Sequence, residues 1–322
     1  METQELNNNN QYRCIYAILS CLFLSITYVA SLYVWSSPHT REHSSTIKKR
    51  FFSVFIMALI SPVFLYFGMS NKVLEKVTIW ELLGLKWSGL LQAIFIPLIL
   101  TMILFLGPLC LQGLNGQWKL YFEPMYWIGN ARTLIWWRNL VVAPLSEEWT
   151  FRACMLPLLL QCFSPTAAIF ICPLFFGVAH FHHVVERTKV GMELKSAVIL
   201  SSTLSICIYH DIWSVCSFFI CQNRFIIYSF IRTKFFNKSF TVSTFFPGHF
   251  VAPFAAHSFC NHMGFPDLTE VLAYNNFLKR AGFFSLFVIG LVAWCFLLTP
   301  LTNPTWFNNN LFWDKNFLQL IT

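Results

Sequence analysis

Three ionisable residues lie within six positions of one another in a long apolar stretch: Glu147, Glu148 and Arg152. Apolar residues precede them at 140–145 and follow them at 153–160. An ionisable side chain at membrane depth is costly, so such residues are expected to be paired or functional. A solvated loop, the ordinary alternative, does not fit these apolar flanks.

Helical spacing separates the roles of the two carboxylates. Positions i and i+4 share a helix face, while adjacent positions point about 100° apart. Glu148 is therefore expected to pair with Arg152, which leaves Glu147 to face a cavity. A carboxylate in a water-poor cavity binds a proton more readily than one in bulk water, and it can accept one from a water molecule. The spacing predicts a chemical role for Glu147 and a structural role for Glu148; a purely structural Glu–Arg network is the less favoured alternative.

Histidines follow in the next apolar run. His180 lies one helical turn beyond Phe176, so an aromatic ring and an imidazole would share a face. His183 is interpreted as an interfacial residue at the end of the run, and the role of His182 stays open. His180 lies deeper in the run and is a candidate for chemistry.

A second pair of polar side chains, His257 and Asn261, also lies one helical turn apart in an apolar run. Two donors that converge on one atom in a water-poor site can form an oxyanion hole, with about 3 kcal/mol of transition-state stabilisation from each. The alternative is that Asn261 only bonds to another helix. Cys260 would point away from the face that these two residues share, so it is discounted as a nucleophile.

A metal centre is the main chemical alternative. Glu147, His180 and His257 would make a two-histidine, one-carboxylate set with a position left for water, as zinc hydrolases use. The sequence lacks His-Glu-x-x-His, Gly-x-Ser-x-Gly, P-loop and Gly-x-Gly-x-x-Gly motifs. Zinc is an open alternative at this point.

The elements that must hold these residues are transmembrane helices. Of the 322 residues 56% are hydrophobic and only 11% are charged, against about 25% charged in soluble domains. This composition excludes an ordinary soluble globule and predicts a single all-α polytopic bundle. About 20 apolar residues are needed for each span, and eight runs qualify: 14–35, 51–67, 90–111, 133–162, 165–183, 197–221, 248–265 and 281–301.

The spans divide by their charge content. Residues 14–111 carry almost no ionisable residue within the apolar runs and are interpreted as scaffold, whereas 133–301 hold the candidate catalytic groups. Residues 36–50 form a polar, basic loop, and 71–86 are expected to lie at the interface as an amphipathic segment. The first span is expected to be retained rather than cleaved, because the residues before it are polar without positive charge. The tail from Asn303 is expected at the interface.

Charge and cysteine content narrow the functional classes further. The net charge of +8 comes from loop residues, with no aromatic-interleaved basic patch, so nucleic acid is not an expected partner. The 11 cysteines show no regular framework and lie mostly in apolar runs, so they are interpreted as small core residues.

The three motifs together resemble those of the type II CAAX prenyl endopeptidases, the Ras-converting enzymes. They are Glu-Glu-x-x-x-Arg at 147–152, Phe-x-x-x-His at 176–180 and His-x-x-x-Asn at 257–261. The likeness is strong over 139–186 and 248–266 and weak in the first three spans. Three ordered motifs are a specific signal, whereas any one alone is weak.

The resemblance implies an eight-helix, multi-pass protease of the endoplasmic reticulum membrane. Such an enzyme removes the last three residues of farnesylated or geranylgeranylated CAAX proteins, such as Ras-type GTPases. The family is described as metal-independent. The resemblance therefore implies no cofactor and makes a zinc site the less favoured alternative. Carried over by motif position, the roles are water activation by Glu147 and His180, oxyanion stabilisation by His257 and Asn261, and support of the site by Glu148, Arg152 and Phe176.

One segment departs from the family pattern. Residues 224–247 add an aromatic and basic stretch without a counterpart, which would disturb the geometry if it displaced the span that holds His257. A catalytically silent scaffold of the same superfamily is therefore an alternative, beside a zinc-dependent protease. A transporter with buried charges is a third alternative, but the sequence shows no related halves.

Overall fold

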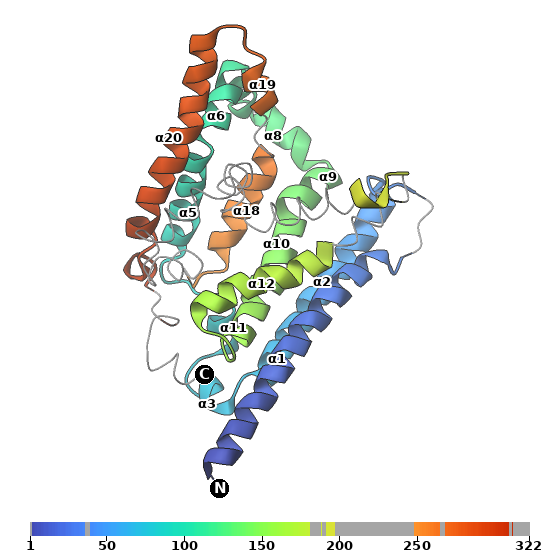
Figure 1. The fold of residues 1–322 in the computed structure, drawn as a ribbon. Helices are drawn as coiled ribbons and strands as arrows, with labels where there is room; N and C mark the ends of the chain where they lie inside the picture. The colour runs from blue at the N-terminus through green and yellow to red at the C-terminus, as the bar shows by residue number, and fades with distance from the viewer. Residues whose placement is uncertain are drawn as a thin grey trace.

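The computed structural model describes residues 2–35, 39–180, 188, 191–196, 248–264, 268–308 and 311, and all regular elements in these ranges are helices (Figure 1). Three of the described helices are long and apolar enough to cross a membrane, and a bent pair adds a possible fourth span. The predicted all-α membrane bundle is confirmed. The expected run at 197–221 and the unusual segment at 224–247 lie outside the described residues.

Helices α1 (Glu2–Tyr33) and α2 (Ser44–Gly68) pack side by side along one flank of the molecule. The polar loop was expected to run to residue 50, but α2 begins at Ser44, so the basic residues at 48–50 lie in its first two turns. Lys and Arg are good helix formers whose apolar stems lie along a helix surface. Hydropathy therefore marks the apolar span and misses the true start of the helix.

A disulfide joins Cys14 in α1 to Cys162, just beyond α11 (Met155–Leu159). The interpretation of the cysteines as core residues is wrong for this pair. It holds for Cys21 and Cys172, which are buried thiols. The partners of the disulfide are 148 residues apart, so no local spacing could have revealed it.

The third expected span, 90–111, is broken into α5 (Leu90–Leu104) and α6 (Leu106–Leu114), which meet at 73°. Pro108 has no N–H and cannot donate to the carbonyl of Leu104, its partner in a continuous α-helix. The break at Phe105 coincides with this lost donor, whereas Pro97 loses its donor within α5 without breaking that helix.

The segment at 71–86 forms two short helices, α3 (Asn71–Leu74) and α4 (Ile79–Leu82). Side-chain caps begin both, from Ser70 and from a capping box between Thr78 and Glu81. The chain then turns at Gly84, which has a positive φ of 77°. The carbonyl of Gly84 accepts a 3.0 Å hydrogen bond from the backbone N–H of Phe250, directly before α18 (Val251–Met263).

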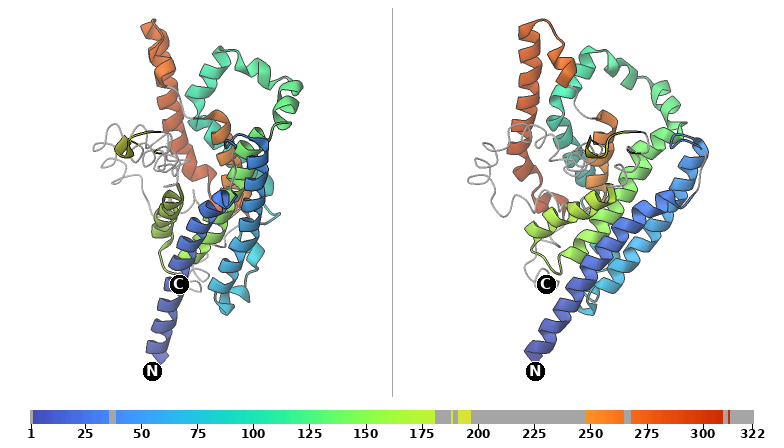
Figure 2. Two further views of the ribbon diagram at one scale, coloured as in Figure 1. Left: turned by 90° about the vertical axis from the view of Figure 1, so that its right-hand side faces the viewer. Right: turned by 45° about the vertical axis from the view of Figure 1, so that its right-hand side comes forward.

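Two further short helices, α7 (Gln117–Tyr121) and α8 (Pro124–Ala131), link α6 to α9 (Leu134–Trp137) in an arc (Figure 2). The sequence interpretation had not assigned them. Aromatic rings of the arc pack against His262 of α18, with centroid distances of 5.3 Å from Tyr121 and 5.7 Å from Trp127. The arc is thus tied to α18 near Asn261.

The C-terminal part contains α19 (Leu268–Leu272), α20 (Phe277–Leu301) and the 3-10 turn η3 (Pro304–Phe307). Helix α20 packs beside α5 and α6. Trp306 is exposed, as expected of an interfacial tail, whereas Phe307 is completely buried. The tail is therefore partly built into the bundle.

The expected run at 133–162 is a continuous helical path made of α and π turns. It consists of α9, η1 (Arg138–Val142), α10 (Ala143–Glu147), η2 (Glu148–Cys154) and α11. Helix α12 (Pro165–His180) follows and contacts α1, α11 and η2. The two π segments lie on either side of α10, which ends at Glu147, and π turns inside α-helices occur frequently at functional sites.

Candidate active site

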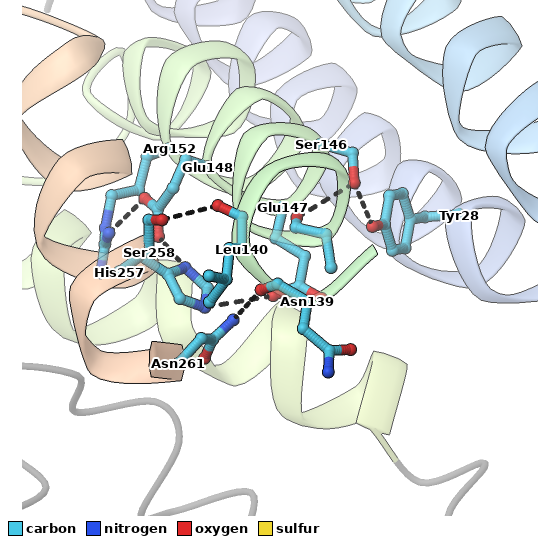
Figure 3. Close-up of polar contacts among 11 residues, drawn as sticks. Tyr28, Asn139, Leu140, Ser146, Glu147, Glu148, Arg152, His257, Ser258 and Asn261 are labelled. Carbon is cyan, nitrogen blue, oxygen red and sulfur yellow. Dashed lines mark hydrogen bonds and ion pairs between the residues drawn. The ribbon is translucent and has the colours of Figure 1, made fainter. Parts of the chain in front are cut away.

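A buried ionic cluster joins η2 to α18 (Figure 3). The carboxylate of Glu148, whose side chain is 4% exposed, accepts a hydrogen bond from Arg152 Nη1, as the helical spacing predicted. Its other oxygen, Oε1, lies 2.7 Å from Nδ1 of His257, which is 5% exposed. Buried charges of this kind persist only when they are paired, and Glu148 is paired on both sides.

Glu147 lies against the same imidazole. Its Oε2 is 3.7 Å from His257 Nε2, and its side chain is 20% exposed. Two adjacent carboxylates therefore flank one ring, which the sequence had not predicted. The wider turn of a π-helix reduces the angle between adjacent side chains, and the transition from α10 to η2 falls between these two residues.

The contact with Glu148 determines which ring nitrogen of His257 carries hydrogen. An ionised carboxylate can only accept, so Nδ1 donates to Glu148 Oε1. Nε2 is left directed at Glu147 Oε2 across a gap longer than a direct hydrogen bond.

Asn261 lies one turn beyond His257 on α18, and both side chains point toward the path that runs from η1 to η2 (Figure 3). Asn261 Nδ2 donates to the carbonyl of Asn139 at 2.9 Å, so the expected alternative of a bond to another helix is present. An amide nitrogen carries two hydrogens, and this bond uses one of them. Ser258 makes a second bond across the same interface, from Oγ to the carbonyl of Leu140 at 2.6 Å.

Helices α1 and α2 hold the segment that carries the two carboxylates. Tyr28 of α1 lies 2.8 Å from Ser146 Oγ, and Ser146 in turn donates to the carbonyl of Ala143. Trp149 Nε1 donates to the carbonyl of Ala58 in α2 at 2.9 Å. Sequence reasoning missed these contacts; the available signal was a tyrosine within an apolar run, since a buried phenol usually needs a partner.

The Phe-x-x-x-His motif at 176–180 is described only in part. Phe176 and His180 lie on α12, and His180 is its last residue. Helix α12 is attached to η2 by a hydrogen bond from Cys172 Sγ to the carbonyl of Phe151. The side chains of Phe176 and His180, together with His182 and His183, lie outside the described residues. The role of His180 stays a prediction.

The two-histidine, one-carboxylate set that was considered for zinc includes His180, so the structure describes only two of its three members. Among the described residues, no group of three His, Cys, Asp or Glu side chains is placed to hold a metal ion. Glu148 and His257 bind each other, and Arg152 binds Glu148.

The fold and the site together define a class: helical membrane proteins that carry a buried carboxylate–imidazole cluster between two of their helices. Comparison with known proteins narrows this class. A family model described as type II CAAX prenyl endopeptidase, Rce1-like, matches residues 129–263, the range that contains every predicted site residue. No solved structure matches the chain significantly.

Curated relatives match over most of their length. The chain is 36% identical to human CAAX prenyl protease 2 over 298 residues, which are 90% of this chain and 82% of the human protein. It is 30% identical to CAAX prenyl protease 2 of Arabidopsis thaliana, with 91% of this chain and 92% of that protein covered. This chain belongs to the type II CAAX prenyl endopeptidases, a family of membrane proteases.

Proposed function

We propose that this protein removes the C-terminal tripeptide from farnesylated or geranylgeranylated CAAX proteins, Ras-type GTPases among them. The names of the relatives, CAAX prenyl protease 2, support the substrate class. The observation that carries the proposal for this chain is the contact of one buried imidazole, His257, with two adjacent carboxylates, Glu147 and Glu148. Positioned carboxylates and imidazoles are the groups that most often transfer protons in hydrolysis.

In the proposed reaction Glu147, assisted by His180, takes a proton from the attacking water. The oxygen of that water bonds to the carbonyl carbon of the peptide bond after the prenylated cysteine. Glu147 then passes the proton to the leaving amine as the C–N bond breaks. Two features support Glu147 for this role: it is more exposed than Glu148, and it lies outside the ion pair with Arg152.

His257 and Asn261 are proposed to stabilise the negative oxygen of the tetrahedral intermediate. Asn261 would use the hydrogen that is not donated to Asn139. His257 donates through Nε2 when both of its ring nitrogens carry hydrogen, and the carboxylate of Glu148 at Nδ1 compensates the positive charge of that form. Glu148 and Arg152 thereby support the site without touching the substrate.

The protein is proposed to act in the endoplasmic reticulum membrane, with its site open to the cytosolic side. Long apolar helices support the membrane location. The lipid anchor of a prenylated substrate would enter from the bilayer, and its peptide end would approach from the cytosol, where prenylated proteins arrive. Membrane lipid would therefore surround the helices and also deliver the prenyl anchor of the substrate to the site.

Incubating membranes that contain the protein with a farnesylated CAAX peptide tests the proposal. The wild type is expected to release the tripeptide, and His257→Ala is expected to lower the rate by about 10²- to 10³-fold, because a donor to the oxyanion is lost. Mass spectrometry of the released tripeptide measures both rates.

Two controls make the result specific. His262→Ala removes a histidine on the same helix that packs against Tyr121 and Trp127, and it is expected to keep most of the activity. The same peptide without its prenyl group should be a poor substrate. Equal cleavage of both peptides would contradict the proposed substrate class, and no release by the wild type would favour the silent scaffold.

The reaction is also proposed to proceed without a metal ion. Arg152 places a positive charge beside Glu148, and this charge opposes the binding of a divalent cation in the same cluster. A strong chelator is therefore expected to leave the rate of tripeptide release unchanged. Loss of activity that added zinc restores would contradict this expectation and establish the zinc-dependent alternative.

A further inference from the structure

The backbone carbonyls of η1 lie next to a residue that cannot donate a hydrogen bond. In an α-helix, position 144 would donate to the carbonyl of Leu140, and in a π-helix it would donate to that of Asn139. Pro144 has no N–H and serves neither carbonyl. The helical path here is in transition between the two registers, since Ala143 N–H donates to the carbonyl of Arg138, five residues back.

Helix α18 supplies donors to both of these carbonyls. Ser258 Oγ lies 2.6 Å from the oxygen of Leu140, and Asn261 Nδ2 lies 2.9 Å from that of Asn139. The two donor side chains lie about one helical turn apart on α18, and they bond to the carbonyls of two adjacent residues of η1 (Figure 3). A backbone carbonyl that is left without a donor in a low-dielectric interior is unfavourable, so both contacts favour one placement of α18.

This attachment fixes the direction in which His257 points. His257 directly precedes Ser258, and Ser258 is half-buried against η1 while His257 is buried against Glu148. A rotation of α18 about its axis would break the Ser258 bond and move the imidazole away from the two carboxylates. The hydroxyl of Ser258 donates a hydrogen bond to the Leu140 carbonyl. A serine nucleophile would instead direct its hydroxyl toward a base, so Ser258 is not placed to act as one.

We propose that Ser258 is a positioning residue of this enzyme. By bonding to the carbonyl that Pro144 leaves without its α-helical donor, Ser258 sets the rotation of α18 at which His257 meets both Glu147 and Glu148. This inference deepens the proposed function and rests on it for its effect on rate. Its structural half, the coupling between Ser258 and Pro144, is independent of catalysis.

The kinetic test compares Ser258→Ala with Ser258→Thr in the prenylated-peptide assay. The alanine variant is expected to lower kcat by about 10- to 100-fold with KM nearly unchanged, because displacement of a catalytic group by about 1 Å costs up to about 100-fold. The threonine variant keeps the hydroxyl and is expected to recover most of kcat. Ser285→Ala is the matched control, since Ser285 also donates to a carbonyl, that of Gly282 within α20. An inactive threonine variant, or a change confined to KM, would overturn the positioning role.

The second test measures coupling through thermal unfolding of the purified protein in detergent. Pro144→Ala introduces an N–H that can serve the Leu140 carbonyl, so Ser258→Ala is expected to lower the unfolding temperature less in this background than in the wild type. Equal losses in the two backgrounds would overturn the inference. This readout does not need activity, so failure of the proposed function and failure of the Ser258 inference give different results.

Discussion

Replacing Glu147 by Gln is expected to lower kcat for tripeptide release by about 10²- to 10⁴-fold, the usual contribution of a positioned general base. The amide is close in shape to the carboxylate but cannot accept a proton from water. Because Glu147 is partly exposed and Arg152 is bonded to Glu148 instead, the substitution leaves the buried ion pair intact. The unfolding temperature is therefore expected to stay close to that of the wild type.

The matched control for this substitution is Glu123→Gln, which removes an exposed carboxylate at the start of α8. Both variants change the net charge by the same amount, so a general electrostatic effect on substrate binding would appear in both. Only Glu147→Gln is expected to lose activity. If it kept the wild-type rate, Glu147 would not be the base, and the proton transfer would have to be assigned to another group.

The contacts that sequence reasoning found are those within one helical segment. The pairing of Glu148 with Arg152 follows from a four-residue spacing in an apolar stretch, and the structure confirms it. The break after Leu104 was not predicted: Pro108 removes a donor one turn later, but Pro97 also removes one and lies inside the unbroken α5. A local rule suffices for the ion pair because both of its groups belong to one short stretch of chain.

The contacts that sequence reasoning missed depend on packing between distant segments. His257 meets Glu148 across 109 positions, and its approach depends on how α18 docks on η1. The π turns were missed for a related reason: Pro144 shows that one donor is absent, but the neighbouring helices decide which register the chain adopts. Tyr28 bonds to Ser146 across 118 positions in the same manner.

Helices α1 and α2 illustrate how helices with almost no ionisable residue in their apolar runs still take part in the site. Their contacts reach the residues on either side of the two carboxylates, through Tyr28 to Ser146 and through Ala58 to Trp149. Helices α1 and α2 resemble the family only weakly in sequence, yet they contact the segment that carries the two carboxylates. One phenol and one backbone carbonyl make these two contacts, and several apolar sequences could present such groups equally well.

Glu148→Gln is expected to destabilise the folded protein by about 3 kcal/mol, near the lower end of the 3–5 kcal/mol typical for breaking a buried ion pair. The lower end applies because Arg152 is 26% exposed, so water can partly solvate the guanidinium that is left behind. Activity is expected to fall as well, since the charge opposite His257 Nδ1 is lost. Thermal unfolding in detergent and the peptide assay measure the two effects.

The exposed ion pair between Glu42 and Arg138, at 3.3 Å, provides the comparison for this result. Glu42→Gln is expected to cost less than about 1 kcal/mol, as surface pairs do, although it removes the same charge. The double variant Glu148→Met with Arg152→Met is expected to be more stable than Glu148→Gln alone, because neither partner is then left as an uncompensated charge. If the double variant were the less stable of the two, the pair would contribute net stability in its own right, and the supporting role of Arg152 would extend beyond neutralising Glu148.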